Sequence, residues 1–332
     1  MKKVFISLLA SMMAIVTVQA QQIAVVSGST TTLCQTFKDA IETASNNSVI
    51  YLPAGGFPIG DDVKITKPLT IYGLTHKSNS DNADGRTTIS GNLFFEEGSD
   101  GSIVMGCYIS GNVYIGTEGA SVEGIRLRYN NLNSVQVQNS ECRGIEVNQC
   151  YVRDKSNFGN ANAFITNNVI HSIRSVKGGK IENNIITSYF SISYSSVTMN
   201  CYIITADDTT IKNNVMMATS GSIASYANWS LFSGNNCEAV GNMLRQNWGE
   251  ECVKVDVDWS EVFVRNAGIN PYSDFHFKDN YKQYTNIGIY GGTGFSDDAL
   301  PPVPYIVESK VDEQTDAAGK LKIRIHVKAH GE

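Results

Sequence analysis

One short phrase recurs along the chain, and it constrains the fold more than any other feature of the sequence. Its pattern is apolar-x-Asn-Asn-apolar-apolar, and it occurs as ITNNVI (165–170), IENNII (181–186) and IKNNVM (211–216). When the second asparagine is taken as an anchor, the same frame extends along the chain in both directions. The anchor positions are then Cys107, Asn131, Cys150, Asn168, Asn184, Asn214 and Asn242.

The positions around the anchor are apolar in most copies, with Arg128 as the clear misfit, while the sequence between copies varies. Successive anchors lie 24, 19, 18, 16, 30 and 28 residues apart. Similarity in fixed columns at a spacing of roughly 20–30 residues is the signature of a solenoid. The repeated stretch is rich in Asn, Ser, Gly, Thr, Ile and Val, which favour strands and turns over helices. The sequence therefore predicts an all-β fold, a parallel β-helix.

The coils of such a solenoid stack about 4.8 Å apart, so residues in one column lie directly above one another. A column of asparagines satisfies its own amides, because each side chain donates to one neighbour and accepts from the other. We expect such a ladder in one turn of the solenoid, with Cys107 and Cys150 as compact buried substitutes. Its asparagines are Asn131, Asn168, Asn184, Asn214 and Asn242. The repeated phrase is thus a folding device and carries no catalytic signal.

The two ends of the repeat region have patterns of their own. Residues 36–46 predict an amphipathic helix that covers the N-terminal end of the solenoid, with Thr36 and Asp39 as a capping box. Residues 321–327 alternate strictly between apolar and polar, which predicts a strand with one buried face. Together with residues 305–312 this strand predicts a C-terminal β-hairpin that packs on the solenoid; a surface adhesive strand is the alternative.

The segments that flank the repeats also resemble a known family. The predicted helix is followed by IYLPAG (50–55) and KPLTIYG (67–73), and this order resembles the N-terminal region of right-handed β-helix proteins of the pectate-lyase-like superfamily. DFHFKDNYKQYTNIGIYGGTGF (274–295) is similar to the C-terminal segments of secreted bacterial β-helix proteins. The resemblance implies a single-stranded right-handed parallel β-helix of roughly eight to eleven coils over residues 33–300.

The N-terminus has the features of a signal peptide. Lys2 and Lys3 precede an apolar stretch and a small-residue cleavage site, so we expect cleavage near Ala20. The apolar run is shorter than the roughly 20 residues of a membrane-spanning helix, so no transmembrane segment is predicted. We expect a protein that is secreted, periplasmic or on the surface of a Gram-negative bacterium. The predicted organisation is a signal peptide, the β-helix and a Pro-led hairpin segment, over residues 1–20, 21–300 and 301–332.

Charge and cysteine content narrow the classes of partner. The chain has 26 Lys and Arg against 32 Asp and Glu, and loses two lysines with the signal peptide. This acidic balance argues against nucleic acid, whose phosphates are bound by basic surfaces. The seven cysteines have no zinc-binding spacing, and we interpret most of them as buried small hydrophobic residues. We expect few or no disulfides and a monomeric protein.

The strongest local candidate for a site is VKVDVDW (253–259). In a strand, Lys254, Asp256 and Asp258 share one face, above a base of apolar residues. Carboxylates two residues apart on a strand face lie about 6–7 Å apart. That separation suits an inverting acid/base pair or two ligands of a Ca²⁺ ion. The alternative interpretation is an ordinary solvated face of a late coil.

A second candidate is cationic and lies on successive coils. Arginine binds carboxylates in bidentate fashion, so these side chains are candidates for contact with uronate or sulfate groups. Solvated surface charge is the alternative. The tryptophans offer flat rings that either stack on sugars or fill the core. The basic residues are Arg126, Arg128, Arg143, Arg153 and Lys155, with His171 aligned to Arg153, and the tryptophans are Trp229, Trp248 and Trp259.

Signature motifs for catalysis are missing from the sequence. Pectate lyase, pectin lyase and polygalacturonase motifs do not occur, nor does GxSxG. DNADG (81–85) faintly echoes an acidic hydrolase motif, but such clusters are typical of turns. We therefore predict a non-catalytic protein that binds polysaccharide. The alternative is a polysaccharide lyase or glycoside hydrolase that acts on an acidic, uronate-containing polysaccharide, because this fold hosts both classes.

Overall fold

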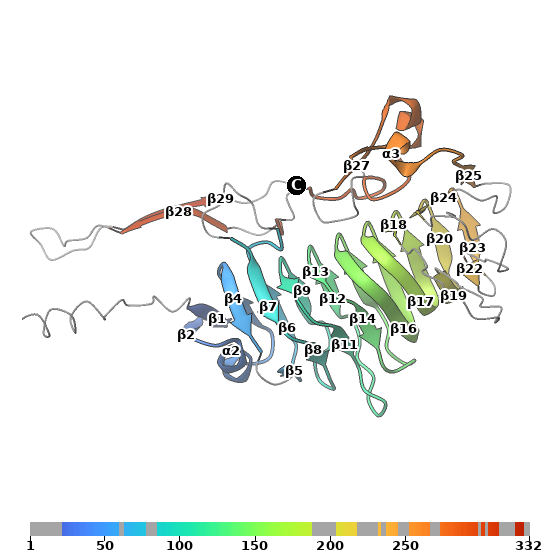
Figure 1. The fold of residues 1–332 in the computed structure, drawn as a ribbon. Helices are drawn as coiled ribbons and strands as arrows, with labels where there is room; N and C mark the ends of the chain where they lie inside the picture. Colours follow the sequence, from blue (N-terminus) through green and yellow to red (C-terminus); the bar gives the residue numbers. More distant parts are fainter. Residues whose placement is uncertain are drawn as a thin grey trace, which may run out of the picture.

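The computed structural model is built mainly from strands, as Figure 1 shows. It describes residues 22–59, 63–77, 85–187, 204–217, 232–233, 237–244, 252–265, 273–297, 300–302, 305–311 and 323–328. The predicted signal peptide, residues 1–20, lies outside these ranges, as do Trp229 and Trp248. One sheet contains 25 strands. The all-β prediction is confirmed, and no helix within the described ranges is long and apolar enough to cross a membrane.

The strands of the large sheet line up in three columns of parallel pairs, named here by their place relative to the anchor. The pre-anchor column contains β3 (Ser48–Tyr51), β6 (Leu69–Tyr72), β9 (Ile103–Met105), β12 (Arg126–Arg128), β15 (Ile145–Asn148), the last residues of β16 (Tyr151–Thr166) and β17 (Val169–Glu182), β20 (Thr210–Lys212) and β23 (Glu238–Val240).

The other two columns follow the anchor in the chain. The post-anchor column contains β4 (Gly55–Pro58), β7 (Thr87–Ser90), β10 (Tyr108–Ile109), β13 (Asn131–Leu132), the first residues of β16 and β17, β18 (Ile185–Ile186), β21 (Val215–Met216), β24 (Met243–Leu244) and β25 (Val253–Lys254). The third column contains β5 (Val63–Ile65), β8 (Leu93–Phe95), β11 (Val113–Ile115), β14 (Val135–Val137), the middle of β16 and β17, β19 (Ile204–Asp207) and β22 (Phe232–Ser233).

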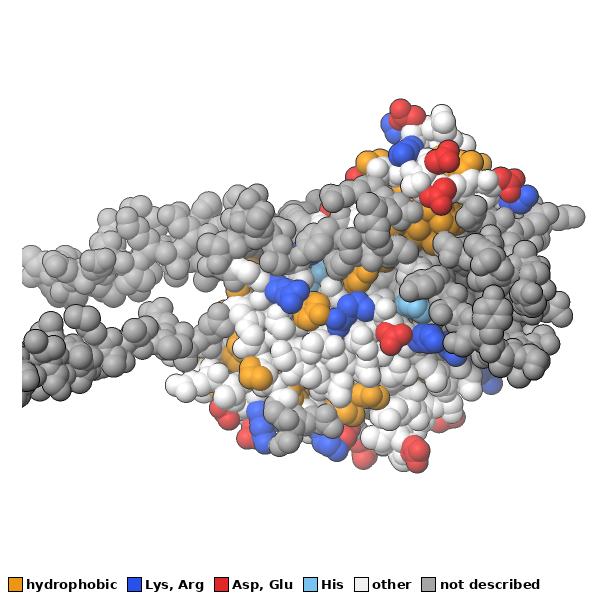
Figure 2. Space-filling model, in the orientation of Figure 1, with side chains coloured by type: hydrophobic (Ala, Val, Ile, Leu, Met, Phe, Trp, Pro, Cys, Tyr) orange, Lys and Arg blue, Asp and Glu red, His pale blue; other side chains and the backbone are white. Residues whose placement is uncertain are grey.

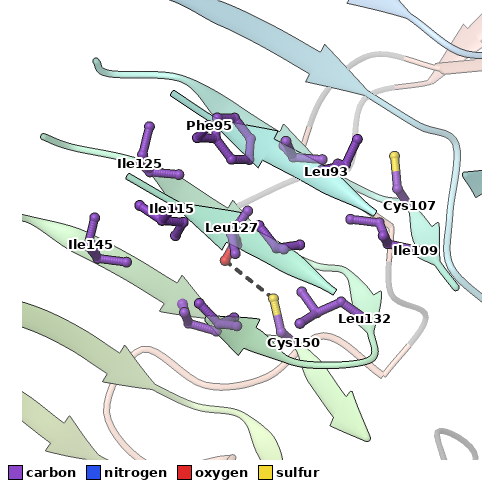
Figure 3. Close-up of a cluster of buried hydrophobic side chains, with 14 of the residues drawn as sticks. Leu93, Phe95, Cys107, Ile109, Ile115, Ile125, Leu127, Leu132, Ile145 and Cys150 are labelled. Atoms are coloured by element: carbon purple, nitrogen blue, oxygen red, sulfur yellow. Dashed lines mark hydrogen bonds between the residues drawn. The ribbon is translucent and has the colours of Figure 1, made fainter. Parts of the chain in front are cut away.

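From β3 to β24 the chain visits the three columns in the same order, and one such visit is called a pass here. Alternate residues of a strand point to the same side of the sheet. In β8 and β11 these alternate residues are Leu93, Phe95 and Ile115, all fully buried. Figure 3 shows their side chains gathered with those of neighbouring passes in one core. Each fully buried residue of this size contributes about 1.5–3 kcal/mol of burial energy, which favours stacking of the passes.

The N-terminal end is covered as the sequence predicts, and by an additional hairpin. Helix α2 spans Phe37–Thr43, and the Thr36 hydroxyl caps it by accepting from the Asp39 backbone N–H at 3.1 Å. The helix packs its apolar side inward through Phe37, Ala40 and Ile41. Before it, β1 (Ile23–Ser27) pairs antiparallel with both β2 (Thr30–Cys34) and β3. This pairing, which the sequence interpretation did not include, gives β3 a partner on its outer side.

After β25 the chain leaves the columns and folds back over them. It forms α3 (Trp259–Val262), β26 (Phe263–Arg265), β27 (Asp274–Phe277) and the 3-10 helix η1 (Asp279–Tyr284). In Figure 1 these elements lie above the green and yellow strands of the large sheet. Their apolar side chains form a second core with outward-facing residues of the post-anchor column, which include Val169, Ile185, Val215 and Met243.

The C-terminal strands form a sheet of their own. β28 (Tyr305–Val311) and β29 (Ile323–Lys328) pair antiparallel, as the sequence predicts for a hairpin. The residues between them, 312–322, lie outside the described ranges. Packing of this hairpin on the rest of the protein stays a prediction.

Candidate functional site

The charged residues of VKVDVDW do not share one strand face. β25 ends at Lys254, so Asp256 and Asp258 lie beyond the strand. Lys254 Nζ lies 2.9 Å from Asp256 Oδ1, and both side chains are largely exposed. Asp258 is the N-cap of α3 and accepts a hydrogen bond from the Ser260 backbone N–H at 2.8 Å. The expected strand-face geometry is therefore wrong, because the chain turns into α3.

The same residues do not provide the ligands that calcium requires. Ca²⁺ takes six to eight oxygen ligands. Within the described ranges, no group of three or more His, Cys, Asp or Glu residues is placed to hold a metal ion. Asp256 and Asp258 are instead engaged by a lysine and a helix N-terminus. The donor set seen here does not fit Ca²⁺.

A buried ladder of side chains lies in the turn between the pre-anchor and post-anchor columns. Nδ2 of Asn168, Asn184 and Asn214 donates to Oδ1 of the next asparagine at 2.9 Å. The same nitrogens donate at 2.8 Å to backbone carbonyls one pass earlier, so the amides are satisfied without water. We call this ladder the inner column, and all its members are fully buried: Cys107, Asn130, Cys150, Asn168, Asn184, Asn214 and Asn242.

One predicted member of the ladder is displaced by one residue. Asn131 pairs with Tyr108 and Tyr151 as the first residue of β13. Asn130 takes the ladder position, because its Oδ1 accepts from the Cys107 backbone N–H at 2.9 Å. This frame also removes the misfit noted in the sequence, since apolar Leu127 then stands three residues before the anchor. The anchor rule is wrong in RYNNLN because the apolar residue that follows comes one position later.

Cysteine occupies two positions of the inner column. Cys150 Sγ lies 3.3 Å from the Leu127 carbonyl oxygen, the dashed contact in Figure 3. This carbonyl corresponds to those that accept from the asparagine amides in later passes. Burial raises the pKa of the Cys107 and Cys150 thiols to about 12, so both are protonated at neutral pH. Protonated, buried thiols are inert, and the two residues are structural.

The residue before each member of the inner column is in the left-handed conformation, with φ between 51° and 71°. Glycine and asparagine adopt this conformation most readily, which explains the first asparagine of the repeated phrase. We call these residues the outer column: Gly106, Tyr129, Gln149, Asn167, Asn183, Asn213 and Gly241.

The outer column holds a segment from the far end of the chain, residues 286–297, which we call the C-terminal strap. Asn183 Nδ2 donates to the backbone carbonyls of Asn286 at 2.6 Å and Gly288 at 3.2 Å. Asn167 Nδ2 donates to those of Ile289 at 2.9 Å and Gly291 at 2.7 Å.

The strap continues in the same direction past these two asparagines. The Gln149 side-chain oxygen accepts from the Ser296 backbone N–H at 2.8 Å, and Lys77 Nζ donates to the Asp297 carbonyl. Successive strap positions therefore bind successive passes, running back toward the N-terminal end.

The basic residues singled out in the sequence are not gathered in one place. Arg128 makes a bidentate pair with Glu146, at 2.6 and 2.7 Å, and Arg126 lies 3.9 Å from the same carboxylate. Arg143 and Lys155 are exposed. Only Arg153 joins a cluster that is suited to an external ligand, and this cluster lies on the post-anchor column.

That cluster consists of Arg86, Tyr108 and Arg153, named here the Arg-Tyr-Arg cluster. The guanidinium carbon of Arg86 lies 3.9 Å from the centroid of the Tyr108 ring, and that of Arg153 lies 4.7 Å from it. Arg153 Nη1 also donates to the Tyr108 hydroxyl at 2.5 Å. All three side chains are half-buried. Figure 2 shows basic side chains gathered over the middle of this face, with a hydrophobic side chain between two of them.

An aromatic pair lies on the outer side of the third column, one turn further along the chain. The rings of Phe94 and Tyr114 stack with centroids 4.7 Å apart and planes 9° from parallel. The two residues are register partners on β8 and β11, and Lys64 and Gln136 flank them in the same row. Both rings are half-buried, so one side of the stack faces solvent.

A polar turn connects the cluster with the aromatic pair. Arg153 Nη2 donates to the Ser110 carbonyl at 3.1 Å, and Asn112 Nδ2 donates to the Tyr114 hydroxyl at 3.1 Å. Asn133 Nδ2 in turn donates to Asn112 Oδ1 at 2.8 Å. The cluster and the aromatic pair thus belong to one hydrogen-bonded strip.

A small pocket beside this strip contains a buried histidine. His76 lines it with Tyr151 and with Ile289 and Phe295 of the strap. Both ring nitrogens of His76 are buried and have no hydrogen-bond partner among the described residues. Burial, reinforced by the nearby positive charges, lowers the pKa of His76 to about 3, so the ring is neutral.

Sequence reasoning missed the aromatic pair and Arg86, although one signal for the pair was present. Ile-Ser-Gly-Asn occurs at 89–92 and again at 109–112, and this repeat places Phe94 and Tyr114 in the same column position. Nothing comparable marks Arg86. Comparison of the chain with protein-family models, curated proteins and solved structures finds no match.

Proposed function

We propose that the chain is a right-handed parallel β-helix that binds a polysaccharide on its outer surface. The order of the strands supports this fold, because each pass contributes a strand to each of three parallel columns. The inner column supports it further, since its hydrogen bonds join one pass to the next. Two strands of a column are connected through the other columns, and such crossovers between parallel strands are right-handed in about 98% of cases.

The observation that carries the binding function is the aromatic pair. Sugar rings have faces of C–H groups, which pack on flat aromatic surfaces. Phe94 and Tyr114 stack on each other with planes 9° from parallel, so they present an apolar ridge of ring edges on the solvent side of the third column, and sugar C–H groups can pack on this ridge. Gln136 lies beside it in the same row, and its Nε2 donates to the Ser134 hydroxyl and the Lys155 carbonyl, which leaves its side-chain oxygen to accept from a sugar hydroxyl. Aromatic rings with polar neighbours are the combination that suits a carbohydrate better than an apolar ligand.

The proposal is tested by retention of the protein on a panel of pectic, alginate, glycosaminoglycan and neutral polysaccharides. The double substitution Phe94→Ala, Tyr114→Ala should weaken binding about tenfold or more, because it removes the apolar ridge on which the sugars pack. Phe164→Ala is the matched control, since Phe164 is an exposed aromatic residue on the pre-anchor column. Equal binding by the double variant and the native protein would contradict the proposal.

The same incubations decide between a binder and an enzyme. Retention without chemical change supports a non-catalytic binder, whereas unsaturated or reducing-end products support the lyase or hydrolase alternative. We also propose that the protein is exported, because of its N-terminal basic and apolar sequence. N-terminal sequencing of protein recovered from the periplasm or medium should begin near Gln21.

A further inference from the structure

We propose that the Arg-Tyr-Arg cluster is an anion site that receives the carboxylate or sulfate groups of an acidic polysaccharide. The inference deepens the proposed function and rests on it. The aromatic pair accounts for contact with sugar rings of any charge, whereas the cluster would select for acidic ones.

The charge balance around the cluster supports an anion site. Arg126 and Arg128 both have an ion-pair partner in Glu146, and its carboxylate balances one of their two charges. Among the described residues, neither Arg86 nor Arg153 has a carboxylate within 4.0 Å, although acidic residues outnumber basic ones in this chain. Two guanidiniums against one aromatic ring repel each other, and a bound anion would relieve that repulsion.

The available hydrogen-bond donors of Arg86 also support an anion site. Arg86 uses Nε to reach the Thr88 hydroxyl at 3.2 Å, and its two terminal nitrogens have no partner among the described residues. Those nitrogens form the planar fork that binds carboxylate or sulfate oxygens in bidentate fashion. The Tyr108 ring beneath holds this fork in place through a cation–π contact.

Arg153 has a different part in the site. Its nitrogens donate to the Leu132, Ile109 and Ser110 carbonyls and to the Tyr108 hydroxyl. The side chain is therefore fixed, and it supplies a positive charge at a defined place. Rigid placement of this kind reduces the entropy that is lost when a ligand binds. Arg86 is thus the residue that touches the anion, and Arg153 is a positioning residue.

The position of the cluster beside the aromatic pair also supports an anion site for a polysaccharide. Tyr108, the aromatic residue of the cluster, precedes Tyr114 by six residues. Only the turn at Ser110–Asn112 separates the two strands that carry them. The bonds of Arg153 to Ser110 and of Asn112 to Tyr114 make this turn part of both surfaces. One polysaccharide chain that stacks on the aromatic pair therefore has its neighbouring sugars beside the cluster.

The test compares charged polymers with uncharged counterparts. Dissociation constants are measured at low salt for polygalacturonate, its carboxyl-reduced form, dextran sulfate and dextran. We expect the native protein to bind at least one charged polymer about tenfold or more tightly than its uncharged counterpart. A preference for polygalacturonate assigns the site to carboxylates, and a preference for dextran sulfate assigns it to sulfates.

Arg86→Gln should abolish this preference while leaving binding of the uncharged polymers unchanged. Arg86→Lys should restore it in part, since lysine keeps the charge but not the fork. Arg126→Gln, at an exposed arginine on the pre-anchor column, is the matched control and should keep the preference. Unchanged thermal unfolding of the variants shows that they are folded.

The three possible negative results have two distinct meanings. Equal affinity of the native protein for charged and uncharged polymers overturns the anion site and leaves the proposed function standing, as does a preference that survives Arg86→Gln. Failure of the native protein to bind any of these polymers or any member of the wider polysaccharide panel overturns the proposed function, and the anion site with it.

Discussion

The inner and outer columns are adjacent in the sequence and use the same residue type for opposite purposes. Asn184 is fully buried and bonds to asparagines one pass away in either direction. Asn183, its neighbour, is in the left-handed conformation and bonds to a segment about one hundred residues later in the chain. A repeated dipeptide thus encodes two independent constraints, one within the stack of passes and one between the stack and a later segment of the chain.

The two columns should therefore differ in how much stability each asparagine provides. The inner column closes hydrogen bonds where no water is present, so a missing partner leaves buried donors and acceptors unsatisfied. The outer column bonds to a strap that is exposed at Asn286, so water can replace the contact between Asn183 and Asn286 when it is lost.

The largest effect is expected for Asn184→Ala in the inner column. The substitution leaves the Asn168 backbone N–H and side-chain amide without their acceptor and opens a cavity. We expect a loss of about 3–5 kcal/mol in the free energy of unfolding, measured by denaturant titration. Gln138→Ala, at an exposed position, is the control. A loss below about 1 kcal/mol would mean that the ladder does not hold the passes together.

Acidification should have an intermediate effect on stability, and it should weaken only the contacts of the strap. The pKa of His76 is about 3 in the folded protein and about 6.5 when unfolded, so the unfolded state binds more protons between these values. Stability should therefore fall as pH drops below 6.5, by about 2 kcal/mol at pH 5.

His76→Leu removes this titration and tests it. The variant should lose about 2 kcal/mol less than the native protein between pH 7 and pH 5, measured by denaturant titration at each pH. Lys77 and Arg86 are present in both proteins, so their charges cancel in the comparison. Gln138→Ala, which removes no titratable group and lies at an exposed position, should lose as much stability as the native protein over the same pH range. Hydrogen exchange that rises first in the inner column at pH 5 would contradict the assignment to the strap.

The smallest effect is expected for Asn183→Gly in the outer column. Glycine keeps the left-handed conformation without strain and removes only the bonds to Asn286 and Gly288. We expect a loss of about 1–2 kcal/mol in the free energy of unfolding. Limited proteolysis should show faster cleavage within residues 286–291, with the rest of the chain still protected. A loss as large as that of Asn184→Ala would remove the distinction between the columns.

Much of the architecture could be predicted because its signals are local. Helix α2 carries its cap and apolar spacing within eight residues, and the hairpin of β28 and β29 follows from alternation. The asparagine frame could be recognised in the sequence because most copies have apolar residues at the same positions around the anchor. It was placed one residue too late at Asn131 because this copy has a second asparagine, Asn131, where the other copies have an apolar residue directly after the anchor.

The candidate site could not be predicted in the same way, because its residues are far apart in the sequence and adjacent only in the folded chain. Arg86 and Arg153 are 67 positions apart, and no local pattern places both on Tyr108. Asp256 and Asp258 had the spacing of a strand face, but the helix that begins at Trp259 changed the direction of the chain. Alternation predicts a face only while the strand continues, and the sequence gives no sharp sign of where β25 ends.

The strap has a consequence for how such a chain can change in length over evolution. Repeat proteins commonly gain or lose whole repeats, because each repeat contacts only its neighbours. Here the passes that carry Asn183, Asn167 and Gln149 are matched in turn to Asn286, Ile289 and Ser296. An extra pass between them would move every later partner by about 4.8 Å and break the match. Duplication is therefore restricted to passes outside this interval unless the strap lengthens in the same event.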